Sequence, residues 1–163
     1  MKKLALIVLG VLLMQGVNAQ KFVIPTIPGN IEKSEYAKYT QDAMSCVDWL
    51  KSHGPKAARR DDVATFAFWW ITGTPDVHMT LTEDMMKFKD SDLLMLMLGG
   101  WAQYAVQNNS DDQLEGCLAG VNTALEYYEK YRKELPRDKG AEQFIKMRDK
   151  GTLKSYLEKA MVP

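Results

Sequence analysis

The stretch DDQLEGCLAGVNTALEYYEKYRKEL, residues 111–135, carries the longest regular helical pattern in this chain. Its apolar positions recur in steps of three and four, as one face of an amphipathic helix requires: Leu114, Cys117, Leu118, Val121, Leu125 and Tyr128. Asp111 and Asp112 begin the stretch and Pro136 follows it, and these residues are start and stop signals for a helix. Such a helix is about 36 Å long, so we expect it to cross the domain.

Glycines within two helical stretches indicate that helices pack closely on each other. Gly116 and Gly120 have the small-x-x-x-small spacing that lets a neighbouring helix approach. A second helix, expected to begin at Ser91, contains the adjacent pair Gly99-Gly100. The start of this second helix is apolar on all sides, from Leu93 to Leu98, and we therefore expect it at the centre of the domain.

The first 19 residues have the composition of a cleaved bacterial export signal. A basic start, Lys2 and Lys3, precedes an apolar run from Leu4 to Met14 and a small-residue cleavage site at residues 17–19. We expect a signal peptide over residues 1–19 and a mature chain that is periplasmic or secreted. The apolar run is too short to span a bilayer and no second long apolar run follows, so no membrane span is expected in the mature chain.

The pattern after residue 19 predicts a single all-α domain, a bundle of five or six helices. Residues 20–33 carry proline and glycine without a helical period, so we expect an extended leader there and a helical domain over residues 34–163. Besides the two helices above, helical patterns cover residues 34–52, 61–71, 141–150 and 152–160. Residues 56–60 are basic, and we interpret them as a linker or a frayed turn.

Cys46 and Cys117 are the only cysteines of the chain, and each falls on an expected apolar helix face. In an oxidising compartment, two lone cysteines indicate one disulfide, which here would staple the helix over residues 34–52 to the helix over residues 111–135. By closing a loop of about 70 residues, this bond would stabilise the fold by roughly 4 kcal/mol. The alternative is a reactive thiol or a pair of metal ligands.

The charges of the chain balance, with 21 basic and 21 acidic residues, and loss of Lys2 and Lys3 with the signal peptide changes the net charge from zero to minus two. This balance does not favour a nucleic-acid partner. The distribution is uneven, because residues 20–128 hold 9 basic and 15 acidic groups whereas residues 129–163 hold 10 basic and 6 acidic groups. We expect the basic C-terminal segment to be attracted to the acidic body.

The residues that could carry metal or catalytic chemistry form no recognised motif, and we expect no metal and no cofactor. His53 and His78 lack a second ligand at metal-binding spacing, and the chain has neither a nucleophile elbow nor a phosphate-binding glycine loop. Paired carboxylates fall at expected helix starts, where the helix dipole accounts for them: Asp61-Asp62, Glu83-Asp84 and Asp111-Asp112. A copper site is an alternative, built from His78 and thioethers: Met79, Met85, Met86, Met95 and Met97. Methionine is, however, chiefly a packing residue.

The helix over residues 61–71 carries more aromatic side chains than one helix face can hold. Either the helix is buried on several sides, or its surplus aromatic residues form a recognition surface. Burial is the more common fate of large apolar side chains. The candidate contact surface consists of four consecutive residues: Phe68, Trp69, Trp70 and Ile71.

The sequence Gly116-Cys117-Leu118-Ala119-Gly120-Val121, together with the earlier helical cysteine and the export signal, resembles two groups of small periplasmic helical proteins. One group comprises immunity proteins that neutralise type VI secretion amidase effectors, and the other comprises acid-stress chaperones. Proteins of both groups are small, helical and disulfide-linked, and they act by binding other proteins. The resemblance therefore implies a protein-binding role without catalysis. It carries over no functional residue beyond Cys46 and Cys117.

These features favour an exported, non-enzymatic protein-binding module, immunity-type or chaperone-like. The alternatives are a small exported enzyme with an unrecognised carboxylate site and, less favoured, a copper-handling protein. An enzyme should have a pocket of roughly 300 Å³ or more in which Asp, Glu or His side chains converge, whereas a binding module should have a surface patch.

Overall fold

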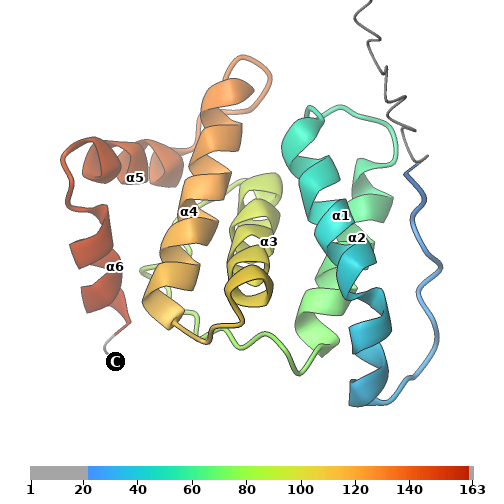
Figure 1. Ribbon diagram of the computed structural model, residues 1–163. Helices are drawn as coiled ribbons and strands as arrows, with labels where there is room; N and C mark the ends of the chain where they lie inside the picture. Colours follow the sequence, from blue (N-terminus) through green and yellow to red (C-terminus); the bar gives the residue numbers. More distant parts are fainter. Residues whose placement is uncertain (1–21, 162–163) are drawn as a thin grey trace, which may run out of the picture.

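The structure is a computed structural model that describes residues 22–161, which form six α-helices, one 3₁₀ helix and no strand (Figure 1). The predicted all-α fold is therefore confirmed. The elements are η1 (Lys33–Tyr39), α1 (Thr40–Ser52), α2 (Arg60–Gly73), α3 (Ser91–Asn108), α4 (Gln113–Lys130), α5 (Lys139–Asp149) and α6 (Leu153–Ala160). The signal peptide expected over residues 1–19 lies outside the described residues.

Helix α4 lies within the predicted helix over residues 111–135, and its boundaries follow from local chemistry. The Asp112 carboxylate caps its start by accepting the backbone N–H groups of Leu114 and Glu115, both at 3.0 Å. The helix ends at Lys130, five residues before the expected end. The chain leaves the helix at Tyr131, whose hydroxyl donates a hydrogen bond to the Ser52 carbonyl at the end of α1.

Helix α3 packs closely on α4 at glycines of both helices. A Cβ atom added to Gly100 would lie 3.1 Å from the Cα atom of Gly120, and one added to Gly120 would overlap the carbonyl oxygen of Met97. Gly116 faces the ring of Trp101 in the same way. The small-x-x-x-small spacing in α4 is thus the site of close helix packing that the sequence predicted.

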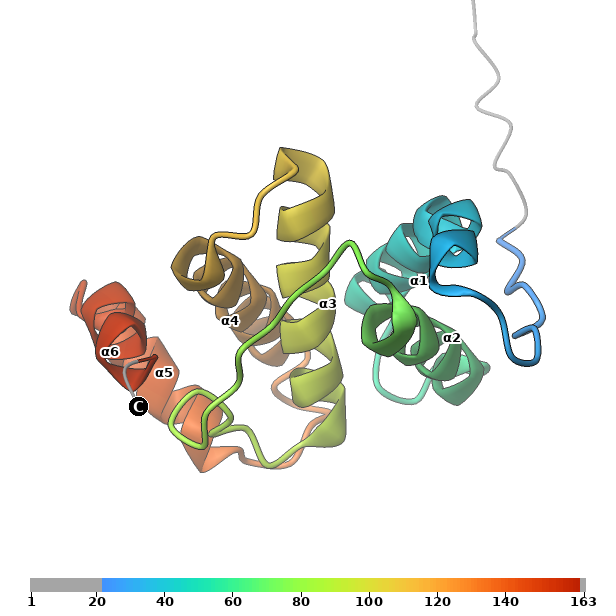
Figure 2. The ribbon, with the colours of Figure 1, turned by 90° about the horizontal axis from the view of Figure 1, so that it is seen from below.

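The other glycine of the α3 pair, Gly99, faces α1 and not α4. A Cβ atom added to Gly99 would lie 2.9 Å from Cγ1 of Val47 in α1. Figures 1 and 2 both show α3 between α4 on one side and the α1–α2 pair on the other. The central position predicted for this helix is confirmed, and each glycine of the pair admits one neighbour.

The predicted disulfide between Cys46 and Cys117 is wrong, because both thiols are free and lie apart. Cys46 belongs to α1 and Cys117 to α4, and α3 stands between these two helices (Figure 2). Both side chains are fully buried in the apolar core, where free cysteine packs as a small hydrophobic residue. The fold is therefore held by packing at this position and not by a covalent staple.

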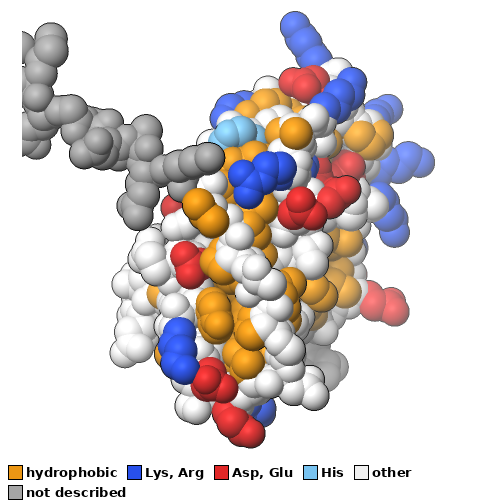
Figure 3. All heavy atoms as spheres, turned by 90° about the vertical axis from the view of Figure 1, so that its right-hand side faces the viewer, with side chains coloured by type: hydrophobic (Ala, Val, Ile, Leu, Met, Phe, Trp, Pro, Cys, Tyr) orange, Lys and Arg blue, Asp and Glu red, His pale blue; other side chains and the backbone are white. Residues whose placement is uncertain are grey.

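The segment from residue 22 to residue 32, within the expected leader, contains no helix and runs along the outer side of α1 (Figure 1). The ring of Phe22 stacks on Trp49 with 5.8 Å between ring centroids, and Ile24 is partly buried against the core. Val23 remains 66% exposed. Hydrophobic side chains form a band down this face of the molecule (Figure 3).

A long connection over residues 74–90 crosses the end of the bundle before the chain enters α3 (Figure 2). The Thr82 hydroxyl donates a hydrogen bond to the carbonyl of Ala160 at 3.0 Å. The buried Asp138 carboxylate, which caps α5, accepts the backbone N–H groups of Lys89 and Asp90. These contacts fix a segment that has no regular secondary structure of its own.

Ion pairs join the basic C-terminal segment to α4. The pair Lys154–Glu115 links this segment to the acidic body, whereas Glu129, the partner of Arg148, belongs to the segment itself. Arg148 of α5 binds both carboxylate oxygens of Glu129, at 2.7 and 3.0 Å, and Lys154 of α6 pairs with Glu115. All four side chains keep substantial exposure to water. These ion pairs therefore help to orient α5 and α6 on α4 and add little to the free energy of unfolding.

We expect the substitution Gly120→Ala to destabilise the protein, because the added methyl group meets the backbone of α3. The overpacking should lower the free energy of unfolding by about 2 kcal/mol, even though alanine has the better helix propensity. Urea denaturation measures this loss. The matched control is Gly29→Ala, where no heavy atom lies within 4 Å of the added Cβ. Equal stability of the two variants would contradict the packing argument.

We expect two free thiols in the unreduced protein after unfolding in guanidinium. In the native protein both thiols should resist an aromatic disulfide reagent at pH 8, because burial raises the pKa of Cys46 and of Cys117 to about 12. Spectrophotometric thiol titration measures both states. Fewer than two reactive thiols in the unfolded, unreduced chain would show that a disulfide does form.

Candidate functional site

The four residues of the predicted contact surface lie on different sides of α2. Trp70 is fully buried and Ile71 nearly so, whereas Phe68 is 49% exposed and Trp69 is partly buried. Trp70 donates its indole N–H to the carbonyl of Tyr36 at 3.0 Å. The four residues cannot form one surface, since consecutive residues of a helix point in different directions.

Trp69 belongs to an aromatic cluster between α2 and η1. Its ring stacks on Tyr36 at 4.9 Å between centroids and meets Tyr39 edge-on at 5.4 Å. Phe66 completes the cluster from the buried side. This side of α2 is occupied by the chain itself, so Phe68 is the residue of the four that is free to meet a partner.

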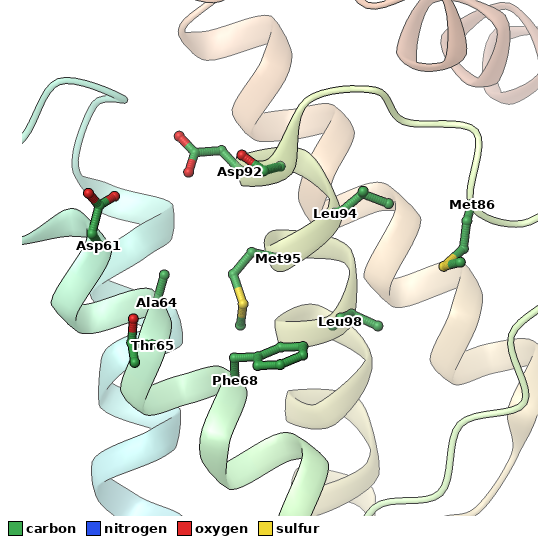
Figure 4. A pocket seen from close by; sticks show the side chains of 10 residues that line it. Asp61, Ala64, Thr65, Phe68, Met86, Asp92, Leu94, Met95 and Leu98 are labelled. Atoms are coloured by element: carbon green, nitrogen blue, oxygen red, sulfur yellow. The ribbon is translucent and has the colours of Figure 1, made fainter. Parts of the chain in front are cut away.

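Phe68 lines an apolar groove of about 590 Å³ between α2 and α3 (Figure 4). The groove is lined by Asp61, Ala64, Thr65, Phe68, Met86, Ser91, Asp92, Leu94, Met95 and Leu98. Along each helix the lining residues recur every three or four positions. The groove therefore spans two helical turns, about 10 Å.

The middle of the groove is apolar and open to solvent. Phe68 of α2 and Met95 of α3 point towards each other across it, and Leu98 lies beside them (Figure 4). Met86, which belongs to the 74–90 connection, borders the groove and is 42% exposed. A concave surface with exposed apolar side chains is the default candidate for a binding site.

One end of the groove is acidic because α2 and α3 both begin there. Asp61 and Asp92 stand at this end (Figure 4). Asp92 forms an ion pair with Arg60 at 2.7 Å, and this guanidinium is 95% buried. Asp61 is exposed and has no cationic partner within residues 22–161.

Arg60 is a structural residue that the sequence analysis missed when it assigned residues 56–60 to a linker. Besides Asp92, its guanidinium binds the carbonyl oxygens of Leu50 and His53 at the end of α1, at 3.1 and 3.0 Å. It also lies 4.9 Å from the ring centroid of Tyr127 in α4. A cation at the first position of a helix opposes the helix dipole, and this mismatch was the available signal that Arg60 has a specific partner.

The residues considered for copper are dispersed. Met85 and Met97 are fully buried in the core, whereas Met86 and Met95 line the groove. His78 lies in a different hollow, of about 400 Å³, where its Nδ1 atom is 3.7 Å from the Asp111 carboxylate. In the part of the chain that the structure describes, no three His, Cys, Asp or Glu side chains gather as a metal site.

The paired carboxylates also remain separate, each at its own place in the fold. Asp112 caps α4, and Asp84 pairs with Lys87 and accepts the hydroxyl of Tyr156. The side chains of His78 and Asp111 are largely exposed, so water screens their interaction. Of the acids and bases considered for the enzyme alternative, Asp76, His78 and Asp111 share the 400 Å³ hollow, and all three side chains are exposed to solvent there.

Within residues 22–161, none of the helices combines the length and the apolar composition that a bilayer span requires. Comparisons with protein-family models, with curated proteins and with solved structures find no match to this chain.

We expect Arg60→Met to destabilise the protein by about 3 kcal/mol, because it leaves Asp92 and two carbonyl groups without their partner. The free energy of unfolding in urea measures the effect. Arg137→Met is the control, since this arginine also forms an ion pair, with Glu142, but its side chain is 76% exposed. The control should lose less than about 0.5 kcal/mol. A similar loss in both variants would show that the burial of Arg60 is not the cause.

Proposed function

We propose that this protein is a non-enzymatic, exported protein-binding module whose binding surface is the groove between α2 and α3. The observation that carries the proposal is the apolar, solvent-open middle of the groove, with Phe68 and Met86 both more than two-fifths exposed. Burying this surface against a partner is favourable because apolar area leaves water.

The side chains of the groove suit a protein partner. Phe68 offers a rigid aromatic contact at low entropic cost, and aromatic residues are common among the residues that dominate binding energy. Met86 and Met95 have flexible thioether chains that adapt to partners of different shape. Methionine-lined surfaces are typical of proteins that accept many apolar segments, so the groove favours the chaperone-like version over the immunity-type version.

The same groove gives little support to the enzyme alternative. General acid–base chemistry requires titratable groups that converge on one point. Of the two carboxylates in the groove, Asp92 is held by Arg60, and no histidine, lysine or arginine lines the groove beside Asp61. The copper alternative meets a similar difficulty, since His78 does not share the groove with Met86 and Met95.

We expect the purified protein to suppress the aggregation of an unfolding client protein at near-stoichiometric ratios, as light scattering would show. Phe68→Ser should weaken client binding about thirtyfold, the cost of losing a central aromatic contact worth about 2 kcal/mol. Val23→Ser is the matched control, because it removes an exposed apolar side chain on the leader and not in the groove.

The immunity-type version gives a different result in a second assay. Immobilised protein should then retain one partner from periplasmic and secreted proteins at micromolar concentration, and Phe68→Ser should release it. The groove would be refuted as a binding surface if the protein showed no client protection and retained no partner. It would also be refuted if the Phe68→Ser and wild-type proteins were equally active.

A further inference from the structure

We propose that the groove between α2 and α3 binds an amphipathic helix that carries a lysine or arginine at one end of its apolar stripe. This inference rests on the proposed function and specifies the chemistry of the partner. It follows from the length of the groove, from the spacing of its lining residues and from the charge at its acidic end.

The dimensions of the groove match one face of a helix. Its two walls are α2 from Asp61 to Phe68 and α3 from Ser91 to Leu98, each about 10 Å long. A partner helix presents apolar side chains at positions i, i+3 or i+4, and i+7 over the same length. Three or four such side chains can enter between the walls, where Phe68 and Met95 face each other (Figure 4).

Carboxylates gather at the acidic end of the groove. Four carboxylates surround the starts of α2 and α3: Asp61, Asp62, Asp90 and Asp92. Against them stand Arg60 and two helix N-termini, each of which contributes roughly half a positive charge. These groups offset about two of the four negative charges, and Lys56, Arg59 and Lys89 add positive charge nearby, so the carboxylate that remains without an ion-pair partner on the groove side is Asp61.

The basic residues near this end lie outside the groove. Lys56 and Arg59 line an adjoining hollow with Asp61 and Asp62, but the ion pairs within residues 22–161 include none between these groups. Arg59 directs its guanidinium over the ring of Phe22, 5.9 Å from the centroid. No lysine or arginine is among the residues that line the groove itself.

Asp61 is the group that a partner's cation would meet. Asp92 already binds Arg60, and Asp90 uses its carboxylate to accept the N–H groups at the start of α3. Asp61 is exposed, borders the apolar lining and accepts no side-chain hydrogen bond within the described part of the chain. A lysine or arginine on the partner is attracted to the Asp61 carboxylate, whereas an acidic residue at the same place is repelled.

Synthetic helical peptides of about 15 residues, long enough to form a helix, can test this inference. Each carries the same leucine stripe, and a lysine stands either before or after it. In the matched acidic peptides a glutamate replaces the lysine. Of the two lysine peptides, one should bind more tightly because its lysine reaches the acidic end of the groove. Fluorescence anisotropy at low salt should show that the full chain binds this peptide at least tenfold more tightly than the peptide with glutamate at the same position. This ratio should shrink as salt is raised.

Substitutions separate the charge from the apolar contact. Asp61→Asn should bring the ratio close to one while binding is retained, and Asp61→Lys should reverse the preference. Glu126→Gln, which removes an exposed carboxylate of α4 away from the groove, should leave the ratio unchanged. Phe68→Ser should weaken the binding of lysine and glutamate peptides alike.

Three results would overturn the inference. Equal binding of the lysine and glutamate peptides would refute the claim that the partner is basic. Absence of binding by every peptide would refute the claim that the partner is an amphipathic helix. Self-association of the protein that is abolished by Phe68→Ser would make a second copy the occupant. In the first two cases, client protection that depends on Phe68 would still support the proposed function, so the two claims fail separately.

Discussion

The close contact between α3 and α4 at Gly100 and Gly120 is the constraint around which the other helices are arranged. Because these residues lack a Cβ atom, the two helices approach so closely that a Cβ atom added to Gly100 would overlap the Thr123 side chain and one added to Gly120 would overlap the carbonyl oxygen of Met97. Gly99 admits Val47 of α1 on the opposite side. An apolar helix can be central only if its neighbours approach from several directions, and the two adjacent glycines allow this.

The central position of α3 explains two features that sequence patterns alone did not separate. It keeps Cys46 and Cys117 apart, so that two thiols on apolar helix faces become core residues and not a disulfide. It also leaves one side of α2 without a covering helix. The opposite side of α2 is filled by η1 and its aromatic cluster, and Phe68 therefore faces solvent beside α3.

Arg60 gives the groove its rigid acidic end. By binding the last carbonyl groups of α1 and the Asp92 carboxylate together, it fixes the starts of α2 and α3 relative to each other. The same ion pair removes one carboxylate from the chemistry of the groove and leaves Asp61 as the accessible charge. In the proposed interaction, this structural ion pair leaves Asp61 as the charge that the partner helix meets.

The sequence by itself determined the helices, the central place of α3 and the close packing at Gly116 and Gly120, because these depend on local periodicity and on residue size. Only the tertiary structure decided which buried groups meet. The predicted pairing of Cys46 with Cys117 was wrong because helical periodicity shows which side chains point into the core. It does not show which helices lie next to each other. The role of Arg60 and the groove around Phe68 join residues far apart in sequence, and no local pattern specifies such contacts.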